Sequence, residues 1–104
     1  MSTQHAQNLI KVLLDTKADI GGRDDAAMDL SEADAAEARQ ALLAVACDPQ
    51  TPDTILASAG ESLGQIATRA GRPLTHQERA GLTPEARHEY DGATTSTADI
   101  NDGG

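Results

Sequence analysis

The chain has almost no aromatic side chains from which to build a core. Its 104 residues include 19 Ala, no Phe or Trp, and one aromatic residue, Tyr90. Large rings normally supply much of the buried area of a protein interior, so this one must consist of Leu, Ile and Val with small residues between them. Surfaces of Ala and Gly let helices approach closely. The composition therefore predicts a small all-α domain with a modest core and modest stability.

Apolar periodicity predicts two helices in the first third of the chain. Apolar residues recur at helical spacing from Gln4 to Thr16, which predicts the first helix. The pair Gly21-Gly22 predicts a break in helical structure. Asp24 to Leu30 then reads as a short helix with acidic residues in its first turn, where the helix dipole favours them. Its predicted apolar side consists of Ala27, Met28 and Leu30.

A helix hairpin is predicted for the middle of the chain. Ser31 followed by Asp34 resembles a capping box, and the apolar spacing behind it continues to about Cys47. The segment DPQTPD interrupts the pattern, with Thr51 as the expected N-cap and Pro52 at the first position of the next helix. So short a connection is typical of two antiparallel helices.

The second helix of this hairpin contains two glycines, each of which costs roughly 1 kcal/mol relative to Ala inside a helix. Its apolar stripe runs from Ile55 to Ala70, and Gly71 supplies a stop. Gly60 and Gly64 are four residues apart and so lie on one side of the helix. We expect this small-residue strip to pack tightly on the preceding Ala-rich helix. The alternative is a frayed or kinked helix in which the glycines have no role.

Two further helix starts follow before the composition changes. Thr75 to Glu78 forms a capping-box pattern, and Thr83-Pro84 predicts an N-cap followed by proline at the first helical position. Both helices are expected to be brief, with about two turns each. Residues 91–104 are rich in Gly, Ser, Thr and Asp, which is typical of a disordered tail. The sequence thus predicts one domain over 1–90, a bundle of helix hairpins with about four to six helices, and a tail over 91–104.

The net charge of −9, from 17 acidic and 8 basic residues, limits the possible partners. Attraction to phosphates is the main term in nucleic-acid binding, so a nucleic-acid binder is disfavoured and a positively charged partner is favoured. The sequence shows neither a long apolar run nor a secretory signal pattern, and its amphipathic helices lack a basic face for anionic lipid. We expect no membrane role and a cytoplasmic location. Cys47 is the sole cysteine, so no intrachain disulfide can form, and it is expected to be a small buried filler.

Acidic residues gather between the end of the first predicted helix and the start of the hairpin. Eight of them stand against Lys17 and Arg23, a local net charge of −6. One interpretation is a surface that binds a basic partner, with fast association through electrostatic steering. The other is a solvated face whose charges only favour helix starts. The eight residues are Asp15, Asp19, Asp24, Asp25, Asp29, Glu32, Asp34 and Glu37.

Metal binding and catalysis find little support in the spacing of residues. The aspartates and Gly21 do not match the register of a calcium loop, and His5, His76 and His88 lie far apart in the sequence. Glu61 and Ser62 are adjacent on a helix and so point in different directions, unlike a base and its nucleophile. We therefore predict no metal, no cofactor and no enzymatic activity. An enzyme with a shallow carboxylate site stays the weakest alternative.

Residues Leu13 to Arg69 resemble a family of small bacterial HEAT-like helical proteins, many of them immunity proteins of contact-dependent or polymorphic toxin systems. The segments that carry the resemblance are Arg23 to Ala27 (RDDAA) and Gly60 to Leu63 (GESL). The chain departs from the pattern at Ala67 and Thr68, where the family tends to have a large apolar or aromatic residue. The resemblance implies a HEAT-like all-α fold and a protein that binds and neutralises a toxin.

Together, charge and resemblance favour an acidic binding protein that neutralises a cognate bacterial toxin, of nuclease type, by covering its basic surface. The alternative is a non-catalytic scaffolding module, with self-association through an exposed Ala/Leu face. Salt-sensitive association distinguishes the first from the second. The residues predicted to contact the partner are Asp24, Asp25, Asp29, Glu32, Asp34 and Glu61.

Overall fold

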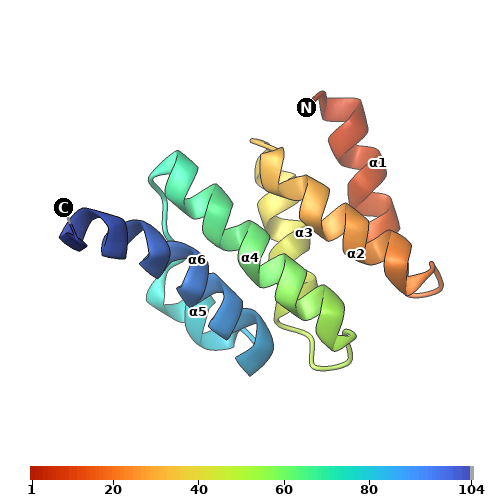
Figure 1. The fold of residues 1–104 in the computed structure, drawn as a ribbon. Helices are drawn as coiled ribbons and strands as arrows, with labels where there is room; N and C mark the ends of the chain where they lie inside the picture. Colours follow the sequence, from red (N-terminus) through yellow and green to blue (C-terminus); the bar gives the residue numbers. More distant parts are fainter. Residues whose placement is uncertain (104) are drawn as a thin grey trace.

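The computed structural model describes the backbone of residues 1–103 and the side chains of residues 1–95. Within these limits the chain is all-helical, as the sequence predicts, with six α-helices, one short 3-10 helix and no strand (Figure 1). The elements are α1 (Thr3–Leu14), α2 (Ile20–Asp29), η1 (Leu30–Glu32), α3 (Ala36–Ala46), α4 (Asp53–Ala70), α5 (His76–Gly81) and α6 (Pro84–Gly103).

Helix α4 lies at the centre of the bundle, between α2 and α3 on one side and α6 on the other (Figure 1). Helix α2 runs parallel to it, because Asp24 bonds to Ser58 and Ala27, further along α2, bonds to Ser62. Helix α3 runs antiparallel, because Arg39 near its start bonds to the backbone of Arg72 just after the end of α4. The predicted α3–α4 hairpin is therefore present.

The core is aliphatic, as the composition predicts. Its largest fully buried side chains are Leu13, Leu30, Leu42, Ile55 and Leu63, and Ala residues fill much of the space between them. Tyr90 is buried as well, and its hydroxyl accepts a hydrogen bond of 2.9 Å from the backbone N–H of Leu74. The only Tyr of a chain without Phe or Trp thus packs in the core and satisfies a buried donor of the α4–α5 loop.

Gly60 and Gly64 allow α4 to approach another helix closely, but that helix is α6 and not the predicted Ala-rich neighbour, α3. A Cβ atom on Gly60 would collide with the backbone of Ala86, and one on Gly64 would lie 2.6 Å from the Cβ of Ala93 and 3.2 Å from the carbonyl oxygen of Tyr90. The order of these contacts shows that α6 runs parallel to α4. The cost of two glycines is therefore offset by backbone-to-backbone packing that no larger residue permits.

The glycine pair near the start of α2 does not break the helix, which corrects the prediction. Gly21 and Gly22 occupy its first turn, where Asp19 is the N-cap and its carboxylate accepts a 3.0 Å hydrogen bond from the N–H of Gly22. A capping carboxylate satisfies a free donor of the first turn and offsets part of the conformational cost of glycine. The break predicted at the glycines falls at residues 15–19 instead.

Helix caps elsewhere are partly as predicted. The capping box of Thr75 and Glu78 is present, and Gly71 ends α4 in the left-handed conformation, with φ of 66°. The capping box predicted at Ser31 is wrong, because residues 30–32 form η1 and α3 begins only at Ala36, with no side-chain cap. Helix α4 begins at Asp53 with Pro52 as N-cap, one residue later than predicted.

The last helix is longer than predicted, and the first part of the predicted tail belongs to it. Helix α6 continues past residue 91, where Asp91 pairs with Arg79 of α5 through two hydrogen bonds, of 2.8 and 2.5 Å. Ala93 packs on α4, and the Thr94 hydroxyl donates to the carbonyl of Tyr90. Composition alone suggested disorder here, but tertiary contact with α4 overrides weak helix propensity. The side chains of residues 96–104, the rest of the predicted tail, lie outside the described part of the chain.

Candidate functional site

The outward side of α2 and η1 presents three of the predicted carboxylates. Asp25 and Asp29 lie one turn apart on α2, and Glu32 ends η1. All three side chains are exposed, and none forms a hydrogen bond or ion pair with any residue that the structure describes. These carboxylates can therefore pair with basic groups of a partner molecule without breaking an internal contact.

Met28 lies among these carboxylates, and its exposure corrects the sequence prediction that placed it on the buried side of the helix. Its residue surface is 48% exposed. It is three residues from Asp25 and four from Asp24 and Glu32, so these positions neighbour one another on one side of the helical segment. We call the surface formed by Asp25, Met28, Asp29 and Glu32 the acidic face.

Met28 is exposed because an arginine occupies the inner stripe of α2. The buried positions of α2 and η1 are Arg23, Ala26, Ala27 and Leu30, which recur at helical spacing. Arg23 is 6% exposed, and its Nε donates a 3.0 Å hydrogen bond to the carbonyl oxygen of Leu13, which ties α2 to the end of α1. The prediction counted apolar residues only, and so it rotated the helix toward Met28.

The other three predicted contact residues have different surroundings. Asp24 is half-buried and accepts a 2.5 Å hydrogen bond from the Ser58 hydroxyl of α4. One of its carboxylate oxygens is therefore already paired within the protein. Glu61 is exposed on α4, accepts a 3.3 Å hydrogen bond from Gln65, and lines a shallow hollow with Glu89 of α6. The structure therefore brings Asp24 next to the acidic face and leaves Glu61 on a different helix.

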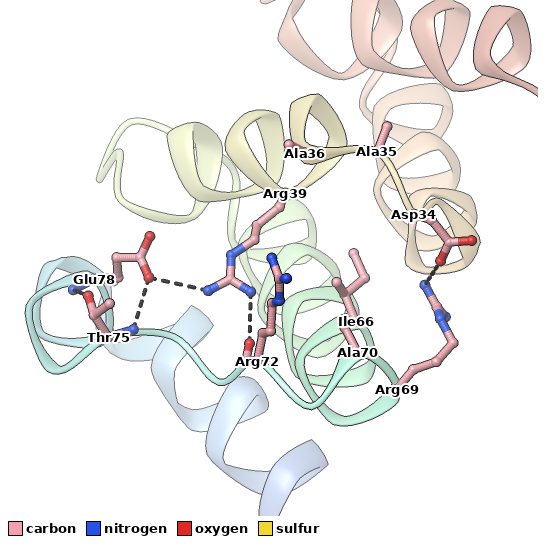
Figure 2. A pocket seen from close by; sticks show the side chains of 10 residues that line it. All are labelled: Asp34, Ala35, Ala36, Arg39, Ile66, Arg69, Ala70, Arg72, Thr75 and Glu78. Atoms are coloured by element: carbon pink, nitrogen blue, oxygen red, sulfur yellow. Dashed lines mark hydrogen bonds and ion pairs between the residues drawn. The ribbon is translucent and has the colours of Figure 1, made fainter.

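Asp34 lies beyond the acidic face and borders a separate pocket of about 660 Å³. The pocket lies where the start of α3 meets the end of α4, and the α4–α5 loop closes a third side (Figure 2). Three of the eight basic residues of this acidic chain line it. Sequence analysis missed this cluster, since only Arg69 and Arg72 are close in the chain and α3 supplies the third. The arginines are Arg39, Arg69 and Arg72.

Two of these arginines are held in place by backbone carbonyls. Arg39 donates to the carbonyl oxygen of Arg72 at 2.8 Å and to the Glu78 carboxylate at 3.3 Å. Arg69 donates to the carbonyl of Ser31 at 2.7 Å. It also donates to the Asp34 carboxylate at 3.4 Å (Figure 2). Both guanidinium groups thus join segments that are far apart in sequence, and they are positioned before any ligand arrives.

Two groups at α5, Glu78 and the neighbouring Cys47, have shifted pKa values. The hydrogen bond from the Thr75 backbone N–H, with a smaller contribution from Arg39, lowers the pKa of the Glu78 carboxyl. Cys47 is exposed, and not the buried filler that was predicted. Its thiol is nevertheless partly covered, 3.7 Å from where a Cβ on Gly81 would lie, and this desolvation, with the Glu78 charge, raises its pKa.

The described residues contain no group of three or more His, Cys, Asp or Glu side chains arranged around a common metal position. The three histidines are exposed. None of the helices, over the part of the chain that was searched, has the length and apolar character needed to cross a membrane.

Comparisons with protein-family models, with curated proteins and with solved structures found no match for this chain. The resemblance to HEAT-like immunity proteins therefore stays a prediction. Its two segments do meet in space, because the Ser62 hydroxyl donates a 2.7 Å hydrogen bond to the carbonyl oxygen of Ala27. Ala26, Ala27, Gly60 and Leu63 are all buried, so packing between α2, α4 and α6 accounts for most residues of both segments.

Proposed function

We propose that this protein acts by binding, and that the acidic face on α2 and η1 docks onto a basic surface of a partner protein. The observation that carries the proposal is the half-exposed Met28 beside three carboxylates that have no partner within the described chain. Protein interfaces commonly combine an apolar anchor with a charged rim.

The charge of the whole chain strengthens this choice of partner. A net charge of −9 attracts basic surfaces over several ångströms and repels nucleic acid and anionic lipid. Charge attraction mainly accelerates association, whereas desolvation of Met28 in a pocket of the partner would slow dissociation. The carboxylates of the acidic face thus favour fast association, and Met28 favours slow dissociation.

The class of partner follows from the resemblance of Leu13 to Arg69. We propose a cognate bacterial toxin, of nuclease type, whose phosphate-binding surface is basic and is covered by the acidic face. Binding at such a surface neutralises the toxin without any chemistry on the part of this chain. Asp24, Asp34 and Glu61 are proposed to extend the contact if the partner reaches across α2 to the loop before α3 or to α4.

The test is co-expression of this protein with the product of the gene immediately upstream, with growth rescue and complex formation as readouts. The purified complex is then measured by stopped-flow association at several salt concentrations. Asp25→Lys and Asp29→Lys should each slow association by about tenfold, and Met28→Ala should accelerate dissociation. Glu85→Lys, an exposed charge reversal on α6, is the matched control and should change neither rate by more than about twofold.

A complex whose rates ignore Asp25, Met28 and Asp29 would disprove the acidic face as the binding surface. The alternative is a self-associating scaffold, which the exposed Leu14 and Ile20 at the turn between α1 and α2 favour. It predicts dimers in sedimentation experiments that Ile20→Ser dissociates and that charge reversal leaves intact.

A further inference from the structure

The pocket between α3, α4 and the α4–α5 loop carries an unpaired positive charge. It is lined by three arginines and by two acids, Asp34 and Glu78. Each acid pairs with one arginine, Asp34 with Arg69 and Glu78 with Arg39. The guanidinium of Arg72 has no hydrogen bond or ion pair with any residue that the structure describes. The pocket therefore holds one surplus positive charge in a chain that is otherwise strongly acidic.

The turn that ends α4 positions Arg72. Gly71 adopts the left-handed conformation, and the N–H of Arg72 donates to the carbonyl oxygen of Ala67 at 3.0 Å. Pro73 follows and restricts the backbone further. The carbonyl of Arg72 is fixed by Arg39 at 2.8 Å, so the base of the side chain is held on both sides. Figure 2 shows the side chains of Arg39 and Arg72 both directed into the pocket.

The remaining walls suit the apolar part of a small anion. Ile66 and Ala70 of α4 face Ala35 and Ala36 at the start of α3 across the pocket (Figure 2). Helix α3 has no side-chain cap, so its first N–H groups and the positive end of its dipole add to the attraction for an anion at this wall. The pocket thus combines the positively charged, planar guanidinium of Arg72 with an aliphatic wall.

We infer that this pocket binds a monocarboxylate with a short branched aliphatic group, its carboxylate on Arg72 and its apolar part against Ile66 and Ala70. A single surplus positive charge balances a single negative charge, whereas a phosphate monoester carries up to two at neutral pH. A planar guanidinium with free donors matches a carboxylate through two parallel hydrogen bonds. The same chemistry occurs in a free branched-chain acid and in the C-terminal residue of a peptide. None of the four residues that define the acidic face lines this pocket.

Backbone amide shifts of the ¹⁵N-labelled full chain test the inference, with N-acetyl-leucine, 4-methylpentanoate, N-acetyl-leucinamide and inorganic phosphate as probes. Both carboxylates should cause saturable shifts at Ala35, Ala36 and Arg72. The amide, which lacks the charge, should cause none. Tighter binding of N-acetyl-leucine than of 4-methylpentanoate by tenfold or more identifies a peptide C-terminus as the ligand, and equal binding identifies a free acid.

Arg72→Gln should weaken carboxylate binding by about tenfold or more, because it removes a charged two-point contact. Arg72→Lys, which keeps the charge and loses the planar fork, should restore part of the affinity. Lys17→Gln is the matched control and should leave binding unchanged. The inference is overturned by an absence of saturable shifts, by equal binding of the amide, by tighter binding of phosphate, or by unchanged affinity in folded Arg72→Gln.

Discussion

The two helices that run parallel to α4 contact it in different ways. Helix α6 lies against Gly60 and Gly64 with backbone close to backbone, and its Tyr90 is buried. Helix α2 packs with small apolar residues and is also bonded to polar side chains of α4, since Ser58 bonds to Asp24 and Ser62 to Ala27. The close packing of α6 depends on the absence of side chains at Gly60 and Gly64, whereas α2 adds two hydroxyl hydrogen bonds to its apolar packing. The comparison teaches that, in a chain poor in aromatic residues, one helix can be held by close backbone packing and another with the help of side-chain hydrogen bonds.

The largest effect is expected from Gly60→Ala. The new Cβ would lie 2.9 Å from backbone atoms of Ala86, so α6 must move away along its contact with α4. We expect a loss of about 2 kcal/mol or more in the free energy of unfolding, even though Ala favours helices. Urea titration measures this value. Gly92→Ala in α6, where a Cβ meets nothing within 4 Å, is the control and should be neutral or stabilising by up to about 1 kcal/mol. Equal stability of the two variants would refute the close contact.

Tyr90→Phe tests the contact between α6 and the rest of the bundle without altering the shape of the buried ring. The substitution removes the acceptor of the buried Leu74 N–H and leaves that donor without its partner. A loss of about 1–2 kcal/mol is expected, because a buried donor pays its full desolvation cost. The free energy from urea unfolding checks this, and a loss below about 0.3 kcal/mol would show that water replaces the hydroxyl.

Ser62→Ala tests the α2 side and should cost about 1 kcal/mol. The hydroxyl is buried and donates to the carbonyl oxygen of Ala27 in the last turn of α2, and the substitution removes this bond. Ser58→Ala, whose bond to Asp24 is partly exposed, should cost less. If either serine variant lost more free energy of unfolding than Gly60→Ala, the contact of α2 with α4 would be the stronger of the two, contrary to this account.

The smallest effect is expected from acid titration at the contact of α5 with α6. The hydrogen bond from Arg79 lowers the pKa of the Asp91 carboxyl below its ordinary value of 3.8. The folded state then binds this proton less readily than the unfolded state, so the contribution to stability is present above pH 3.8 and is lost as the pH falls below it. Asp91→Asn should therefore flatten the fall in melting temperature between pH 5 and pH 3, where it is followed by circular dichroism. An unchanged slope would show that Asp91 is not paired in solution.

The sequence predicted the class of fold because apolar periodicity reports which face of each helix is buried. It also identified Gly60 and Gly64 as a close helix contact and the caps at Gly71 and Thr75. It assigned the wrong partner to the glycines, because α6 comes from a segment whose composition resembles a tail. Local sequence patterns cannot show that Ala93 packs against Gly64 of α4, about thirty residues earlier in the chain.

The candidate sites were predicted less completely than the fold. Charge alone located the acidic residues of α2, but only the structure shows that Arg23 takes the inner position and turns Met28 outward. The arginine pocket left no pattern in the sequence, because it joins α3 with the end of α4 across more than thirty residues. Polar residues that bridge distant segments follow no helical period, so periodicity does not reveal them.

Native-state hydrogen exchange measures the central comparison most directly, since it reports the free energy of opening for each amide. The account predicts that amides of α4 and of α6 up to residue 95 exchange only through global unfolding. Those of α2 should exchange through a smaller opening that leaves α4 and α6 intact. Fast exchange in residues 88–95, or equal protection of α2 and α6, would contradict it.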